Sequence, residues 1–192
     1  MTQAGNIYIV LDTETTGLSS DARIVSICWG LFTETGRKIA IKSHIIFPDG
    51  YTIPEDASAI HGITSAEARR KGVQVQGLLI APNDDINHYK PAMYVGHNVS
   101  FDRPIVVNEY RRAGIRAHLA SLPTYCTMEN TTDLCELPPF RYGSYKWPRL
   151  EELHRHLFGH VHADAHNAEG DVRACAACYF KLVSQGLGPP AI

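Results

Sequence analysis

The sequence lacks long hydrophobic runs, a set of paired cysteines and a leader-like amino end. No stretch of about 18 apolar residues occurs among its 192 residues, so we expect no membrane-spanning helix and no membrane partner. Residues Met1 to Asn6 contain no basic run followed by an apolar one, so we expect no secretory signal. The five cysteines are an odd number. Together these features favour a reduced, cytoplasmic chain.

The sequence also has no marked excess of either charge. Eighteen lysines and arginines stand against twenty aspartates and glutamates, which gives a formal net charge of −2. A protein that holds duplex DNA mainly by charge is usually more basic. An anionic ligand would have to meet a local basic patch, or metal ions that reverse the sign of an acidic site. Candidates for such a patch are Arg103, Lys146, Arg149 and Arg155, although each also fits an ordinary solvated charge.

The composition that is present is typical of one folded domain. Hydrophobic residues make up 44% and charged residues 20%, a normal globular balance. A chain of 192 residues is too short for two ordinary domains. We therefore expect a single domain over residues 1–192, with a core from about 6 to 185. The residues from Gly186 onward include two glycines and two prolines, and we expect them to fray.

Apolar periodicity predicts strands first and helices later. Apolar runs predict strands at Ile7–Leu11, Ile24–Phe32, Lys38–Ile46, Ala92–Gly96 and Tyr125–Met128. Gly36, in the short loop between the second and third runs, predicts a hairpin. Cap and stop signals predict helices over 54–62, from a capping box at Thr64, and over 100–112, 150–158 and 168–184. This order predicts a three-layer α/β domain with a mixed sheet.

Two carboxylates follow the first predicted strand. Residues i and i+2 of a strand point to the same face, so Asp12 and Glu14 should project together from its carboxyl end. Adjacent carboxylates repel each other, and a divalent cation between them makes the arrangement tolerable. Gly17, just beyond, is free to adopt positive φ and let the backbone approach a ligand. Taken alone, the same pattern also fits a strand end with one solvated acid.

Two further acids open predicted helices. Asn98 or Ser100 can cap the helix that carries Asp102 in its first turn, and Asn167 can cap the helix that carries Asp171. An acid in a first turn is also expected from the helix dipole alone. His166 precedes the last helix, and a histidine beside a metal-bound water is a natural general base because its usual pKa is near 6.5.

Two zinc interpretations stay open at this stage. Cys175 and Cys178 have the spacing of half a zinc site, but no second pair accompanies them, and core filling is the simpler interpretation. Four more histidines lie shortly before His166 without a fixed pair spacing: His154, His156, His160 and His162.

Four motifs occur in a fixed order along the chain. D-T-E-T-T-G-L begins at Asp12, I-H-G-I-T begins at Ile60, H-N-x-x-F-D ends at Asp102, and H-x-x-x-x-D ends at Asp171. Together they resemble the DEDDh group of 3′–5′ exonucleases, which includes the proofreading subunits of bacterial DNA polymerase III. The resemblance runs over about residues 7–182, nearly the whole chain.

The resemblance implies a ribonuclease-H-like fold with a five-stranded mixed sheet and an acidic site at the strand ends. It implies a catalytic set of Asp12, Glu14, Asp102, Asp171 and the general base His166, with the four acids binding two divalent cations. Oxygen ligands favour Mg²⁺ or Mn²⁺ as these cations. It further implies a substrate-binding set around the terminal nucleotide: Thr13, Thr15, Thr16, Gly17, Leu18, His61, Asn98 and Phe101.

The expected reaction is release of nucleoside 5′-monophosphates from single-stranded DNA 3′ ends by two-metal-ion hydrolysis. An exoribonuclease that trims RNA 3′ ends is the first alternative, depending on whether groups near Thr15, Thr16 or His61 tolerate a 2′-hydroxyl. The segment from His166 to Asp171 is similar to the final motif of animal three-prime repair exonucleases, which favours DNA.

Two further alternatives concern partners. A proofreading chain that acts only beside a DNA polymerase is one, but only about ten residues follow the last predicted helix, which favours a free-standing monomer or homodimer. A binding module without turnover is the other, and the intact acids and histidine argue against it.

Overall fold

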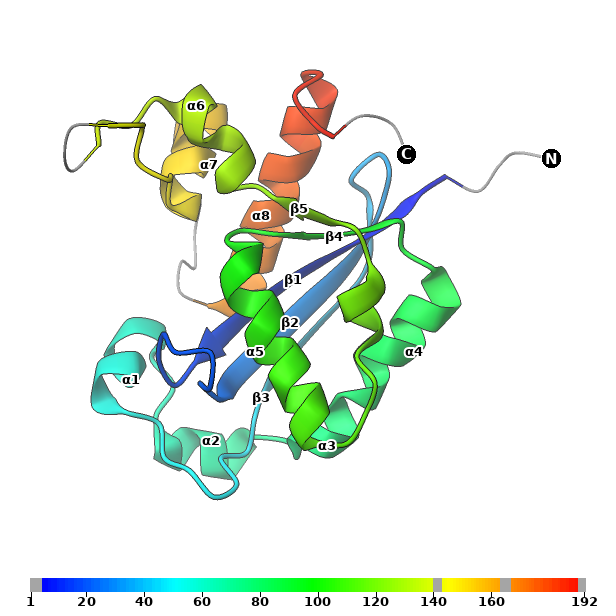
Figure 1. Cartoon of the computed structure of the whole chain (residues 1–192), viewed down its shortest axis with the longest axis vertical. Helices are drawn as coiled ribbons and strands as arrows, with labels where there is room; N and C mark the ends of the chain where they lie inside the picture. Colours follow the sequence, from blue (N-terminus) through cyan, green and yellow to red (C-terminus); the bar gives the residue numbers. More distant parts are fainter. Residues whose placement is uncertain (1–4, 140–142, 163–166, 190–192) are drawn as a thin grey trace.

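The computed structural model describes residues 5–139, 143–162 and 167–189. A five-stranded sheet in the order β3-β2-β1-β4-β5 forms its centre. The strands are β1 (Ile7–Thr15), β2 (Ile24–Thr33), β3 (Lys38–Ile45), β4 (Met93–Gly96) and β5 (Thr124–Cys126). β1, β2 and β3 pair antiparallel, while β4 runs parallel to both β1 and β5. The expected mixed sheet is confirmed (Figure 1).

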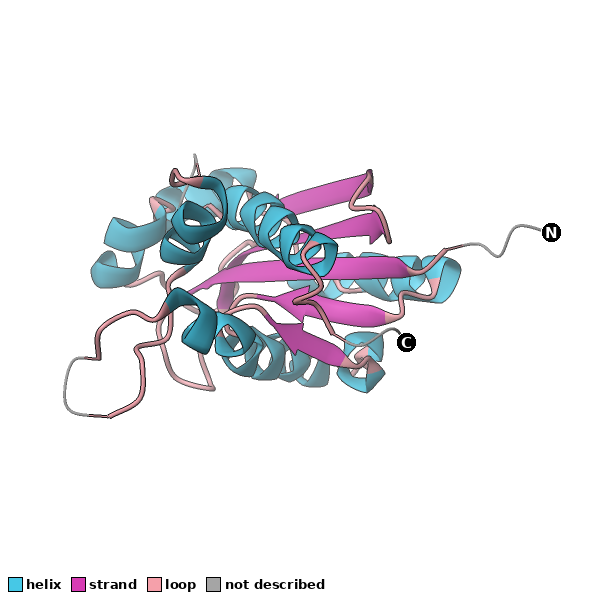
Figure 2. Cartoon of the chain, turned by 90° about the horizontal axis from the view of Figure 1, so that it is seen from above, coloured by secondary structure: helices cyan, strands magenta, loops and turns pink. Residues whose placement is uncertain are grey.

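Helices lie on both sides of the sheet, as the view from above shows (Figure 2). They are α1 (Glu55–His61), α2 (Ser65–Lys71), α3 (Val75–Leu78), α4 (Ile80–Tyr89), α5 (Val99–Arg112), α6 (Thr132–Cys135), α7 (Leu150–Phe158) and α8 (Ala168–Ser184), with 3₁₀ turns at His118–Ser121 and Glu129–Thr131. Among the described residues, none of these helices is both long and apolar enough to cross a membrane.

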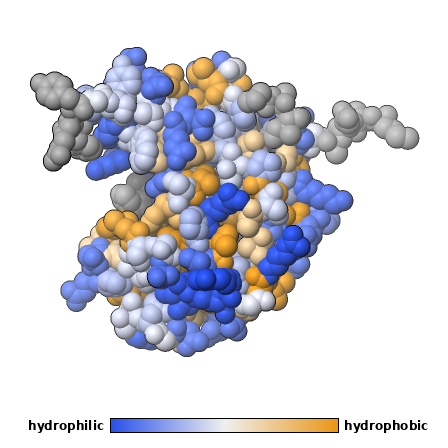
Figure 3. All heavy atoms as spheres, viewed as in Figure 1, coloured by the Kyte–Doolittle hydropathy of each residue, from blue (hydrophilic) through white to orange (hydrophobic). Residues whose placement is uncertain are grey.

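Alternation along β1 divides the core between the two helical layers. Ile9 and Leu11 pack in one cluster with Ile105 of α5, whereas Val10 packs in a second cluster with Val172 of α8. Successive side chains of a strand point to opposite faces, so the two clusters follow directly from the sequence of β1. On the face seen in Figure 1, hydrophilic and hydrophobic residues are interspersed (Figure 3).

Several element boundaries differ from the sequence prediction. β1 continues through Thr15, so Asp12 and Glu14 lie within the strand rather than after it. β5 ends at Cys126 instead of reaching Met128. The predicted side-chain cap of α5 is wrong: Asn98 occupies the N-cap with φ 70°, but its side chain makes no capping bond to a backbone N–H of the helix. Its Oδ1 accepts a hydrogen bond from the Ser100 hydroxyl instead, at 3.0 Å.

Candidate active site

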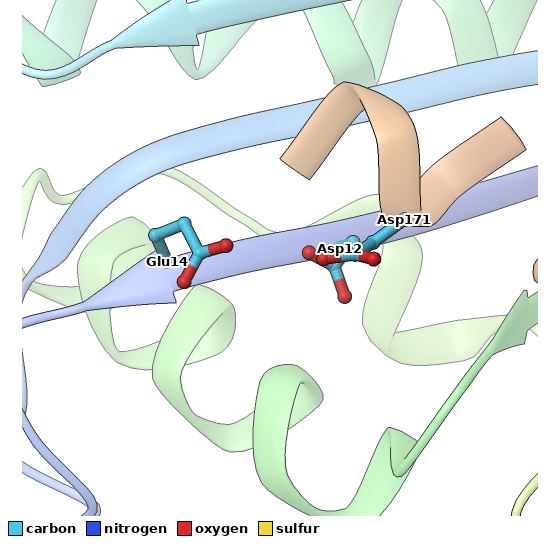
Figure 4. Close-up of side chains that lie close together, drawn as sticks. All are labelled: Asp12, Glu14 and Asp171. Carbon is cyan, nitrogen blue, oxygen red and sulfur yellow. The ribbon is translucent and has the colours of Figure 1, made fainter. Parts of the chain in front are cut away.

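Three carboxylates from two elements meet near the end of β1. Asp12 and Glu14 lie two residues apart on this strand, on the same face as Val10, which is the face that α8 covers. Asp171 lies in the first turn of α8. One carboxylate oxygen from each of the three residues lies within 4.8 Å of the others, a spacing suited to holding a metal ion. Figure 4 shows Asp171 of α8 beside Asp12, with Glu14 farther along β1 toward the end of the strand.

Asp102 approaches β1 from the opposite helical layer. It lies in the first turn of α5 and is only 3% exposed. Its Oδ1 accepts two hydrogen bonds from Thr13, one from the backbone N–H at 3.1 Å and one from the hydroxyl at 2.6 Å. Thr13 points away from Asp12 and Glu14 because side chains alternate along a strand. β1 thus places Asp12 and Glu14 on one face of the sheet, while Thr13 binds Asp102 on the opposite face.

Burial and mutual repulsion raise the pKa of three of the four acids that meet at β1, namely Asp12, Glu14 and Asp102. The pKa of Asp12 is raised well above its usual value by burial, and further by Asp102, Asp171 and Glu14. Burial, with Asp171 beside it, raises the pKa of Glu14 to about 7. Burial raises the pKa of Asp102 to about 7, although its hydrogen bonds from Thr13 oppose the rise. Positive charge placed here would keep these groups ionised.

The donor set fits hard divalent cations. The three clustered ligands are all carboxylate oxygens, which suit Mg²⁺ or Mn²⁺ better than a sulfur- or nitrogen-seeking metal. Within the described part of the chain, the clustered ligand atoms that suit a metal ion come from Asp12, Glu14 and Asp171 alone, so neither open zinc interpretation is supported. Cys175 and Cys178 are both free and buried in the core, and His154 Nδ1 bonds to the carbonyl of His160 at 2.8 Å.

The acids open into a cavity of about 390 Å³. Its lining includes Thr13, Asn98 and Phe101 among the predicted substrate residues. Five other predicted residues are described but do not line it: Thr15, Thr16, Gly17, Leu18 and His61. Four of these residues lie at or just after the end of β1, and His61 is the last residue of α1. Burial lowers the pKa of His61, and its interaction with the backbone of Thr15 opposes this lowering.

Of the candidate basic residues, Arg149 alone is among the described residues that line the cavity. Arg103 donates to the carbonyl of Ala120, which gives it a structural partner, and the Lys146 ammonium lies 2.6 Å from Glu152. The predicted general base, His166, lies outside the described residues. Its neighbour Asn167 caps α8 as predicted, accepting from the N–H groups of Glu169 and Gly170.

Three aromatic residues among those that line the cavity were not predicted as site residues. His162 Nε2 lies 3.5 Å from Asp171 Oδ1, and its only sequence signal was a run of histidines. His97 belongs to the H-N-x-x-F-D motif, and its ring bridges Thr127 Oγ1 at 2.9 Å and the Pro148 carbonyl at 3.0 Å. Trp147 lines the cavity from the segment before α7. No periodicity marks that segment, so no local pattern could predict that Trp147 lies at the site.

Comparison with known proteins agrees with this geometry. Residues 9–179 match the exonuclease family represented by RNase T, and the chain belongs to this family. It is therefore a nuclease of the DEDDh type, as the motifs indicated.

Particular relatives are more distant. Exonuclease CP81 of Escherichia phage 186, described as uncharacterized, is 28% identical over 93% of this chain and 89% of its own length. The zinc-bound E. coli exonuclease I in complex with single-stranded DNA has a TM-score of 0.79 and 23% identity, over 94% of this chain. The same enzyme with a dA16 oligonucleotide has a TM-score of 0.80 and 22% identity. This chain spans only 41–42% of exonuclease I, and the likeness establishes a shared ribonuclease-H-like fold.

Proposed function

We propose that this chain is a 3′–5′ exonuclease that removes nucleoside 5′-monophosphates from single-stranded DNA, using two Mg²⁺ or Mn²⁺ ions. The observation that carries the proposal is the convergence of Asp12, Glu14 and Asp171 within 4.8 Å, in a chain of the exonuclease family. Single-stranded DNA is the proposed substrate because exonuclease I, which shares the fold, binds it. Trimming of RNA 3′ ends is the alternative, and the activity assay below separates the two.

The residues divide the chemistry between them. When bound, the cations activate a water and neutralise charge on the scissile phosphate. Asp12, Glu14 and Asp171 would hold the cations together with Asp102, whose carboxylate Thr13 fixes through two hydrogen bonds. We assign His166 the role of taking the proton from the attacking water as the new P–O bond forms and the bond to the 3′ oxygen breaks. The leaving 3′ oxygen stays on the shortened strand, and the phosphate leaves with the released nucleotide.

An activity assay tests the proposal. Purified protein with labelled single-stranded DNA, duplex DNA and RNA of matched sequence should shorten the single-stranded DNA from its 3′ end only with Mg²⁺ or Mn²⁺ present. Asp12→Ala should lower the rate by more than the 10- to 100-fold typical of a lost outer-shell partner, with an unchanged circular dichroism spectrum. Full activity of Asp12→Ala would refute the site. Faster digestion of RNA would move the substrate to the alternative.

A separate experiment tests which residue is the general base, because His166 and His162 are both candidates. His166→Ala should lower kcat by about 10²–10⁴-fold, the usual range for a lost general base, and the acid limb of the pH–rate profile should disappear with it. His162→Ala is the matched comparison, since His162 lies 3.5 Å from Asp171. If His162→Ala loses that acid limb and His166→Ala retains it, His162 is the base instead.

A partner assay tests the polymerase-associated alternative. Size-exclusion chromatography with a cognate DNA polymerase should leave the chain unshifted if it acts alone, and co-elution would favour a proofreading accessory chain. The same column gives the choice between monomer and homodimer.

A further inference from the structure

Trp147 is a large aromatic side chain left exposed on the wall of the acidic cavity. It is 62% exposed, whereas the other tryptophan of the sequence, Trp29, is 1% exposed and donates its indole N–H to Asp85 at 2.8 Å. Exposure of so large an apolar surface is informative when it coincides with a site. Trp147 lines the same cavity as Asp12, Glu14 and Asp171.

The backbone on both sides of Trp147 is anchored. On one side, the Lys146 N–H donates to the Leu137 carbonyl at 3.1 Å. On the other, the Pro148 carbonyl accepts from His97 Nε2 at 3.0 Å. Glu152 of α7 ties the two sides together, because its carboxylate accepts from the Lys146 ammonium at 2.6 Å and from the Arg149 N–H at 2.7 Å. These bonds anchor the backbone that carries the indole at the wall of the cavity.

The hydrogen bond from His97 to the Pro148 carbonyl does not depend on protonation of the ring at neutral pH. Burial lowers the pKa of His97 to about 4, so the ring is neutral near pH 7. A carbonyl only accepts hydrogen bonds, so Nε2 carries the proton that is donated to Pro148. The other nitrogen then accepts from the Thr127 hydroxyl at 2.9 Å. A partly buried histidine thus connects the segment of Trp147 to the end of β4, whose last residue is Gly96.

We propose that Trp147 is a stacking platform for a nucleobase near the 3′ end of a single-stranded substrate. This inference rests on the proposed function. Every base has a π-face, so an exposed indole grips single strands with little regard to sequence. Stacking also suits a chain with a formal net charge of −2, because a base stacked on an indole is held without an excess of basic residues along the phosphate backbone. Arg149, exposed beside Trp147 on the same cavity wall, provides a cation for a neighbouring phosphate.

Intrinsic fluorescence provides a test that does not depend on hydrolysis. With Ca²⁺ in place of Mg²⁺ to slow turnover, single-stranded oligodeoxynucleotides should quench the tryptophan emission of the wild-type protein. Trp147→Phe leaves Trp29 as the remaining tryptophan, and its emission should be unchanged by the same oligonucleotides. A series with one abasic site at each position from the 3′ end should identify a single position at which quenching is lost. Quenching that persists in Trp147→Phe, or that ignores every abasic site, would overturn the assignment.

Steady-state kinetics provide a second test of the stacking role of Trp147. Trp147→Ala should raise KM for single-stranded DNA roughly 5- to 150-fold, as expected for one lost base–aromatic stack, while kcat changes little. Trp147→Phe should recover most of the loss. Tyr145→Ala is the matched control, because Tyr145 is exposed on the same segment but is not among the described residues that line the cavity. Unchanged KM in Trp147→Ala refutes the stacking role alone, whereas wild-type protein that hydrolyses no nucleic acid refutes the proposed function.

Discussion

Thr13 lies between Asp12 and Glu14 in β1, but its side chain contacts the helical layer on the opposite face of the sheet. The sequence predicted it as a substrate contact, and it does line the cavity. Its hydroxyl, however, donates to Asp102 at 2.6 Å, and its backbone N–H reaches the same oxygen. A hydroxyl and an N–H that both point at one buried carboxylate fix the position of that carboxylate. Thr13 therefore acts through Asp102, as a positioning residue.

Removal of this hydroxyl should weaken the site without removing an acid. Thr13→Val keeps the shape of the side chain but leaves Asp102 with one of its two hydrogen bonds from Thr13. We expect a 10- to 100-fold loss of metal affinity or activity, typical of an outer-shell partner, measured by the Mg²⁺ dependence of the rate. Thr13→Ser restores the donor and should recover the Mg²⁺ dependence. If Thr13→Val shows wild-type Mg²⁺ dependence, the hydroxyl has no positioning role.

Local spacing explains which single residues the sequence could predict. Asp12 and Glu14 are predictable because a strand repeats every two residues, and Asn167 because a cap acts on its own helix. The cap by Asn98 was predicted wrongly: its backbone is left-handed, with φ 70°, and its side chain accepts from the Ser100 hydroxyl rather than from a backbone N–H of the helix. Trp147 owes its position to partners about 50 residues away in the chain, such as His97, and no local pattern reports such contacts.

At the scale of elements, the position of α5 depends on a buried ion-pair group. Glu109 of α5 has a side chain that is 2% exposed. It accepts from Arg23, in the segment between β1 and β2, at 2.6 Å, and from Arg112 at 3.0 Å. Burial alone would lower the pKa of Arg23, but the hydrogen bond and charge of Glu109 outweigh it and raise that pKa, so Arg23 stays charged. The ion pair of Arg23 and Glu109 therefore links α5, which carries Asp102, to the segment that follows β1.

Neutralisation of Glu109 should therefore destabilise the fold. Glu109→Gln keeps the size of the side chain but loses charge-assisted hydrogen bonds, and we expect a loss of about 1.5–3 kcal/mol in the free energy of unfolding. Urea denaturation followed by circular dichroism measures it. The control is Glu67→Gln, which removes an exposed pair with Lys71 on α2 and should leave the midpoint unchanged. Equal midpoints for both variants would show that the buried pair does not stabilise the fold.

Most elements followed from periodicity, and α3 and α4 show where periodicity fails. α4 buries polar residues: Asn83 donates to the Arg116 carbonyl at 2.7 Å, and Asp85 accepts from Trp29 and Lys42. A helix whose buried side includes an amide and a carboxylate has no clear apolar stripe. By contrast, α7 and α8 have clear start and stop signals, and their predicted bounds are confirmed.

At the scale of the whole molecule, the buried acids of the site lower the free energy of unfolding of the metal-free protein at neutral pH. The pKa values of Asp12, Glu14 and Asp102 are raised by burial and by neighbouring carboxylates, Asp171 included, to about 7 for Glu14 and for Asp102. In the unfolded chain these acids ionise at their ordinary pKa values, near 4. Without metal, the folded protein therefore binds more protons, and its stability falls as pH rises from about 4 through about 7. His97, with a pKa lowered to about 4, has the opposite effect between about 4 and 6.5, but it is one group against three.

Divalent cations should reverse this loss, and the reversal should depend on pH. We expect Mg²⁺ or Mn²⁺ at ten times its Kd to stabilise the protein by about 1.4 kcal/mol, which raises Tm by roughly 3–6 °C for a chain of this size. The shift should be large at pH 8 and small at pH 5, where protons compete for the acids. Differential scanning fluorimetry with Mg²⁺, and with EDTA as the reference, measures it.

Asp12→Asn separates this effect from general ionic stabilisation. An amide in place of a repelled, buried carboxylate relieves the repulsion at this position, so the metal-free variant should melt above the metal-free wild type at pH 8. The same variant should lose most of the Mg²⁺ shift, because one of three clustered ligands is gone. A variant that melts lower without metal yet keeps the full Mg²⁺ shift would mean that cations bind elsewhere on the molecule and that these acids serve the fold.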